Sequence, residues 1–167
     1  KANPMDFVEP IKHPKAIVTS FNAEEVEDMR RNCRKQVERA MIEVLLSSGI
    51  RCEELCNLKW EHINMNTKEV TVVEGKGGKS RITMIDDIAR KYLLEYKQSL
   101  KIVGEYIFAT KVSGILKKRS VDSVRSIINK LADRAGVKNA HPHRFRHTFA
   151  TNLFKRGMDV HMIQLLL

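Results

Sequence analysis

Apolar residues recur at intervals of three and four positions along most of this chain, the spacing that places them on one face of an α-helix. One such stripe precedes Gly49, a residue that can end a helix, and consists of Val37, Ala40, Met41, Val44, Leu45 and Ser48. A second lies within residues 120–135 and consists of Val121, Val124, Ile127, Ile128 and Leu131. Both stripes predict helices that pack against a core.

Capping residues extend this prediction to other segments. Asn22, with Glu25 three positions on, is a capping-box pattern for a helix over residues 22–34. Pro142 suits the first turn of a helix over residues 142–155. Further helices are expected to begin at Arg51 and to cover residues 86–100 and 158–167.

Two short runs rich in β-branched residues, 69–73 and 81–85, flank the glycine- and lysine-rich segment 74–80. This pattern predicts a β-hairpin with a basic tip. The predicted fold class is therefore α+β and mainly α-helical, a helical bundle with one small antiparallel β-sheet.

The first 21 residues differ from the rest. They hold three of the four prolines, at positions 4, 10 and 14, and show no helical period. We expect residues 1–21 to be an interdomain linker. Residues 22–167 are expected to form one domain, since a chain of 167 residues with 43% hydrophobic residues can bury a core.

The chain is strongly basic. It has 30 Lys and Arg against 20 Asp and Glu, a formal net charge of +10. Such a surface favours a phosphate-rich partner, although anionic membranes and acidic proteins also attract it. The sequence contains no apolar run of transmembrane length and no signal-peptide pattern, so we expect a cytoplasmic protein without membrane association.

Metal binding is not expected. Cys33, Cys52 and Cys56 are too few and too irregularly spaced for a finger or a disulfide framework, and are interpreted as small buried hydrophobic residues. His143 and His147 have the spacing of two zinc ligands, but arginines lie beside them and no glutamate separates them as in zinc proteases.

The segment 141–151 carries the most informative chemistry. If it is helical, Phe145 and Phe149 can face the core, while His143 and Arg146 share a neighbouring face. An imidazole and a planar guanidinium there could approach one phosphate together. The alternative is a solvated basic helix with a capping histidine.

Two further cations are candidates. Arg51 follows a buried helix directly, which would hold it in place; its structural alternative is a salt bridge to Glu54 or Glu53. Lys76 lies at the hairpin tip, where it could reach into a groove or serve only as an exposed lysine. The tip is not a phosphate-binding P-loop, since Val73 stands where that loop needs glycine and a strand follows where it needs a helix.

Taken in order, these segments resemble the tyrosine recombinase family, which includes phage and transposon integrases. Residues 47–60 resemble the family's first arginine box, with Arg51 in a Gly-x-Arg-x-x-Glu-Leu core. The segment 75–81 is similar to its lysine hairpin, and residues 143–151 to its His-x-x-Arg box. Each motif alone is moderately specific, but their order and spacing together are a strong signal.

The resemblance implies site-specific recombination of double-stranded DNA, such as integration or excision of a mobile element. A tyrosine would attack the phosphodiester, forming a 3′-phosphotyrosyl bond and freeing a 5′-hydroxyl. The catalytic residues it implies are Arg51, Lys76, His143 and Arg146, with no cofactor, no metal and no small-molecule substrate. A tetramer assembled on DNA is the implied partner arrangement.

The family's tyrosine would follow Leu167, so residues 22–167 are expected to be an incomplete catalytic domain that does not cleave DNA. Tyr92, Tyr96 and Tyr106 precede the second box and do not match. Two alternatives remain open: a DNA-binding module without activity, and a type IB topoisomerase-like enzyme, which shares the chemistry but relaxes DNA.

Overall fold

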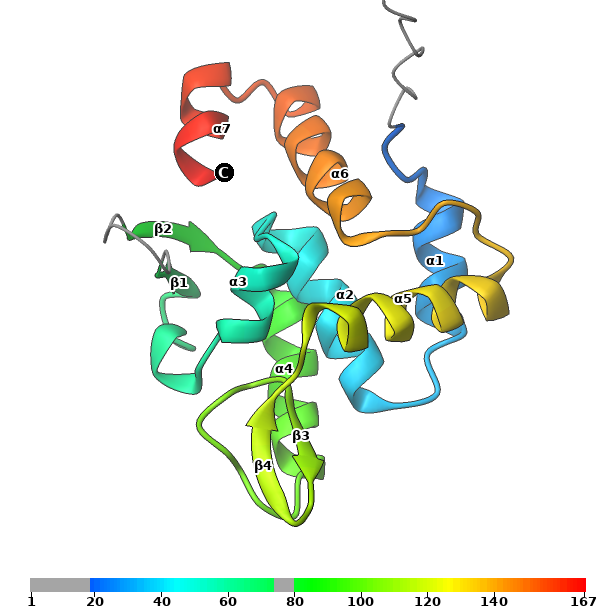
Figure 1. Cartoon of the computed structure of the whole chain (residues 1–167). Helices are drawn as coiled ribbons and strands as arrows, with labels where there is room; N and C mark the ends of the chain where they lie inside the picture. Colours follow the sequence, from blue (N-terminus) through cyan, green and yellow to red (C-terminus); the bar gives the residue numbers. More distant parts are fainter. Residues whose placement is uncertain (1–18, 74–79) are drawn as a thin grey trace, which may run out of the picture.

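A computed structural model describes residues 19–73 and 80–167 of the chain (Figure 1). Among these residues the α-helices are α1 (Ala23–Arg31), α2 (Gln36–Ser48), α3 (Cys52–Asn57), α4 (Asp87–Ser99), α5 (Val121–Ala135), α6 (Pro142–Lys155) and α7 (Val160–Leu166). The strands are β1 (Glu69–Val72), β2 (Arg81–Met84), β3 (Ala109–Val112) and β4 (Ile115–Lys118). The mainly helical α+β class predicted from the sequence is confirmed.

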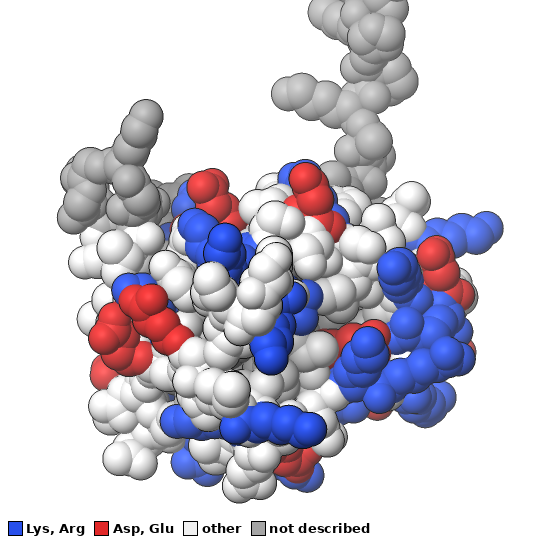
Figure 2. All heavy atoms as spheres, turned by 60° about the horizontal axis from the view of Figure 1, so that its bottom comes forward, with Lys and Arg blue, Asp and Glu red and all other residues white. Residues whose placement is uncertain are grey.

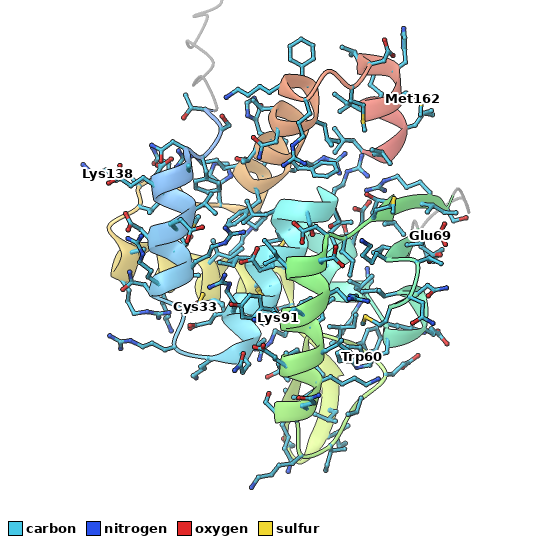
Figure 3. All side chains as sticks on the ribbon, turned by 180° about the vertical axis from the view of Figure 1, so that it is seen from behind. Cys33, Trp60, Glu69, Lys91, Lys138 and Met162 are labelled. Atoms are coloured by element: carbon cyan, nitrogen blue, oxygen red, sulfur yellow. The ribbon has the colours of Figure 1, made fainter. Side chains whose placement is uncertain are left out.

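Helix α2 is the centre of the core. It packs against α4, α5 and α6, and Figure 1 shows it surrounded by these helices. The predicted stripe is buried except for the half-buried Val37, because α2 has neighbours on several sides. In the reverse view of Figure 3, α4, which carries the labelled Lys91, lies across the front of α2. Gly49 terminates the helix after Ser48, as the sequence predicted, and its φ of 63° is left-handed.

A buried carboxylate fastens α1 to α2. The capping box of Asn22 and Glu25 is present, but α1 ends at Arg31, three residues earlier than predicted. Glu43 on α2, with a side chain only 1% exposed, accepts hydrogen bonds from Arg30 at 2.7 and 2.8 Å and from Arg39 at 2.6 Å. A charge this deeply buried is tolerated because two guanidinium groups satisfy its oxygens.

The described residues form two hairpins where the sequence predicted one. Strands β1 and β2 pair antiparallel, with Val72 opposite Arg81, which confirms the predicted hairpin. Strands β3 and β4 form a second two-stranded sheet that was not predicted, so the expectation of a single sheet was wrong. Its two-residue turn is Ser113 and Gly114, both with positive φ, which matches the twist of a tight hairpin.

Buried polar contacts attach the start of the described chain to α6. Phe21 is buried, and its backbone N–H donates to Thr148 Oγ1 at 2.8 Å. The Arg144 guanidinium lies 4.0 Å from the centre of the Phe21 ring and donates to the Thr19 carbonyl at 3.0 Å and to Glu25. Residues 1–18 of the predicted linker lie outside the described residues. In the described ranges, no helix is long and apolar enough to cross a membrane.

Candidate active site

The site begins where α2 ends. Gly49 lies against Phe149 of α6 so closely that a Cβ at Gly49 would be 2.3 Å from the Phe149 ring. This close approach brings the turn between α2 and α3 beside α6. Arg51, the residue before α3, is thereby placed next to the first turns of α6.

A depression of about 520 Å³ collects three of the four predicted residues. Arg51, His143 and Arg146 line it together. The other residues that line it, from α3, α5 and the start of α6, are Cys52, Glu53, Val121, Arg125, His141 and Pro142. The fourth predicted residue, Lys76, lies outside the described residues.

Arg146 is held by backbone carbonyls and crowded by other cations. Its guanidinium donates to the Gly49 carbonyl at 2.8 Å and to the Leu167 carbonyl. Partial burial, together with the charges of Arg51 and Arg81, lowers the pKa of Arg146 to about 10. Guanidinium groups repel one another here, so a bound anion would relieve the repulsion.

Glu54 organises two of these cations. Arg81 donates to both of its oxygens, at 2.7 and 2.8 Å, while Arg51 contributes its side chain at 2.9 Å and its backbone N–H at 2.6 Å. Burial alone would raise the pKa of Glu54, but these hydrogen bonds outweigh it and hold the pKa at about 2. The salt bridge between Arg51 and Glu54 that the sequence left open is present, and Arg51 still lines the depression.

Sequence reasoning missed Arg81. This residue opens β2, and besides pairing with Glu54 it donates from Nε to the Leu166 carbonyl at 3.0 Å. It therefore connects the hairpin, α3 and α7. Figure 3 agrees with this placement, because α7, which carries the labelled Met162, lies beside β2.

Two histidines stand at the start of α6. His143 is exposed, and its ring lies parallel to that of His141, with 6.5 Å between the ring centres. The capping histidine is His141, whose Nδ1 accepts from the Arg144 backbone N–H at 3.3 Å. Burial first, and then the neighbouring His143 and Arg144, lowers the pKa of His141. The capping histidine that the sequence left open as an alternative is therefore His141.

None of the three tyrosines lines this depression. Tyr96 is buried and stacks on Phe108, and burial raises the pKa of Tyr96. Tyr92 lies under the guanidinium of Arg39 at 4.1 Å. These contacts of Tyr92 and Tyr96 are packing contacts.

The cysteines differ from one another. Cys56 is buried, as predicted, whereas Cys33 and Cys52 are only half-buried, so the prediction of burial was wrong for them. Within the part of the chain that the structure describes, no group of three or more His, Cys, Asp or Glu residues could hold a metal ion.

The fold and the site together define a helical domain with arginines and histidines clustered in one depression, a composition suited to an anionic ligand. The model of the family described as "Phage integrase family" matches residues 19–167 of this chain. The chain belongs to this family, whose catalytic domain is that of the tyrosine recombinases.

Similarity to individual proteins supports this family assignment. The chain is 32% identical over 156 residues to the tyrosine recombinase XerA of Pyrococcus horikoshii, covering 93% of this chain and 54% of the relative. The crystal structure of a XerA recombinase matches with a TM-score of 0.78 and 28% identity, covering 89% of this chain and 55% of that one. The integrase from mycobacterium phage Brujita matches with a TM-score of 0.77 and 25% identity, over 99% of this chain and 54% of that one. The chain thus spans about half the length of these relatives.

Proposed function

We propose that this chain is part of a site-specific DNA recombinase that cuts and rejoins DNA through a 3′-phosphotyrosyl intermediate. The observation that carries the proposal is the depression in which Arg51, Arg146 and His143 converge, where partial burial and then the charges of Arg51 and Arg81 lower the pKa of Arg146. Such a site is preorganised for a phosphodiester. The relatives named as tyrosine recombinases and integrases support the same activity.

In this proposal the two arginines stabilise the reacting phosphate. When a tyrosine oxygen attacks phosphorus, the equatorial oxygens gain negative charge, and the guanidinium N–H groups of Arg51 and Arg146 donate to them. His143, exposed beside them, contacts the phosphate and exchanges a proton with the nucleophile.

The bond from phosphorus to the 5′ oxygen breaks as the bond to tyrosine forms. Lys76 would give a proton to the departing 5′ oxygen, a role that rests on the family resemblance alone. The attacking tyrosine is proposed to follow Leu167 in the complete protein. One phosphoester bond replaces another, so no ATP or other energy source is required.

The charge distribution supports double-stranded DNA as the partner. Figure 2 shows Lys and Arg side chains over much of one face, most densely on the right of the view, with fewer acidic side chains among them. The net charge of +10 acts in the same direction. Assembly as a tetramer on DNA and a cytoplasmic location belong to the same proposal.

The decisive experiment uses the protein extended beyond Leu167 and a nicked suicide substrate that traps the covalent complex. Arg51→Ala and Arg146→Ala should each abolish trapping while leaving binding of the substrate largely intact, because the lost interaction forms in the transition state. Arg31→Ala, on the exposed end of α1, is the control. Undiminished trapping by either site variant would overturn the assignment. Relaxation of supercoiled DNA without exchange between two sites would replace recombination by topoisomerase activity.

A further inference from the structure

The depression extends past the three predicted catalytic residues. Arg125 of α5 and His141, the residue that caps α6, also line it, and neither has a role in the chemistry above. We propose that Arg125 and His141 form a second phosphate subsite, which binds the DNA backbone at a phosphate neighbouring the reactive one. This inference rests on the proposed function and adds two binding residues to it.

The packing of α5 on α3 places Arg125 at the site. The two helices are in contact, and Cys52 Sγ lies 4.0 Å from the Val121 carbonyl, so their first turns adjoin. Arg125 follows one turn after Val121 on α5, and both line the depression. The charge of Arg125 also reaches α3, where it helps to lower the pKa of the Cys52 thiol.

Arg125 is available for a ligand. Its side chain is 59% exposed, and its ion pair with Asp122 is long, at 3.5 Å, with an Asp122 side chain that is 91% exposed. An exposed pair of this kind contributes little free energy and is easily exchanged for a phosphate. The guanidinium can then donate two hydrogen bonds to phosphate oxygens.

His141 offers a directed donor. Because Nδ1 accepts from the Arg144 backbone, the neutral ring carries its proton on Nε2. The ring lies parallel to that of His143, with 6.5 Å between the ring centres, and both residues line the depression. Burial, and then the neighbouring His143 and Arg144, lower the pKa of His141, which favours the neutral ring. His141 therefore donates a hydrogen bond to phosphate without contributing a charge.

The contacts of Arg125 and His141 with phosphate predict different salt dependences of DNA binding. A general loss of charge or of the fold would not produce this difference between the two variants. A cation that neutralises one phosphate contributes about 0.9 to the slope of log K against log salt concentration, whereas a neutral donor contributes nothing to the slope. The test is binding of the 167-residue chain to a fluorescein-labelled 20-base-pair duplex, measured by anisotropy across a salt series. A duplex of arbitrary sequence suffices, because phosphate contacts do not depend on base sequence.

Arg125→Ala should weaken binding and reduce the slope by about 0.9. Arg125→Lys should restore the slope. Arg31→Ala is the matched control, since Arg31 also forms a 3.5 Å pair with an aspartate three positions before it but does not line the depression. It should leave the slope unchanged.

His141→Ser keeps a good helix cap and removes the Nε2 donor. It should weaken binding by about tenfold with an unchanged slope, the loss expected for one hydrogen bond to a charged group. Arginine Nε–H and histidine ring signals in NMR spectra should shift for Arg125 and His141 when the duplex is added. Unchanged unfolding midpoints of the variants exclude loss of fold.

The outcomes are distinguishable. If the unmodified chain binds the duplex with a steep salt dependence, but Arg125→Ala and His141→Ser bind as it does, the second subsite is wrong and the proposed function stands. If the unmodified chain does not bind the duplex, the proposed DNA activity falls, and the subsite falls with it.

Discussion

Arg81 and Glu54 face each other as a two-pronged ion pair, with both guanidinium Nη atoms 2.7 and 2.8 Å from the two carboxylate oxygens. Both side chains are mostly buried, 14% and 9% exposed. A planar guanidinium matches a carboxylate in this geometry, whereas a lysine could not make both bonds. The pair connects the base of the β1–β2 hairpin to the helix that follows Arg51.

Glu54→Gln should destabilise the protein in a pH-dependent way. The pKa of Glu54 is about 2 in the folded state against 4.5 ordinarily, so the ionised carboxylate contributes stability above pH 4.5 that is lost as the pH falls toward 2. At pH 7 the variant should lose about 2–3 kcal/mol of unfolding free energy, and the difference should narrow below pH 4.5. Urea unfolding at pH 7 and pH 3 measures this, with the exposed Glu53→Gln as control. An equal loss at both pH values would contradict the assigned pKa.

Gly49→Ala should destabilise far more than a matched glycine change. Gly49 and Gly136 both end helices with left-handed φ, at 63° and 69°, so alanine costs about 1 kcal/mol at either position. Only at Gly49 would the new Cβ overlap the Phe149 ring, which adds about 2–3 kcal/mol. Thermal unfolding of both variants gives the comparison. If Gly49→Ala and Gly136→Ala lose similar unfolding free energy, α6 can shift away from the new Cβ without a cost in stability.

Arg144→Met should loosen the segment that precedes α1. The guanidinium donates to the Lys138 carbonyl at 2.7 Å and to Glu25 at 2.8 Å, and it covers the Phe21 ring. Removing it leaves acceptors unsatisfied, a loss of about 3 kcal/mol. Hydrogen exchange of the Phe21 amide, which is bonded to Thr148, should accelerate. If the Phe21 amide stays protected from exchange in the variant, Arg144 does not hold this segment in place.

The three thiols should react at different rates. A hydrogen bond from Cys56, and the charge of Arg125, lower the pKa of Cys52, whereas burial raises the pKa of Cys33 to about 11. At pH 8 a larger fraction of Cys52 is thiolate, so iodoacetamide should modify Cys52 first. Peptide mass spectrometry over time measures the order. Faster modification of Cys33 than of Cys52 would contradict this order. Duplex DNA should slow the modification of Cys52, because this residue lines the depression.

Local signals in the sequence were enough for much of the fold. Asn22 with Glu25, Gly49 and Pro142 mark helix ends through contacts within a few residues, and the structure places caps at these points. The β3–β4 hairpin escaped prediction because β4 is exposed along its whole length, so its residues show no alternation of apolar and polar positions. Its Ser-Gly turn was the available signal.

Local spacing in the sequence predicted part of the candidate site. His143 and Arg146 lie three apart on one helix, so their shared face follows from helical spacing alone. Arg81 was not predictable in this way, because its partners Glu54 and Leu166 are 27 and 85 positions away in the chain. Pairings at such separations depend on the tertiary packing of β2 against α3 and α7.

The carbonyls at the end of α7 accept from the same guanidinium groups that crowd the site, Leu166 from Arg81 and Leu167 from Arg146. A ligand that recruits those N–H groups must therefore compete with α7 or share donors with it. The docking of α7 on these guanidinium groups and the binding of an anion by them are thus thermodynamically linked. Docking changes anion affinity by the same free energy by which anion binding changes docking. Under the proposed function, an event that moves this helix should change how tightly the depression holds a phosphate, and a bound phosphate should change how firmly the helix is held.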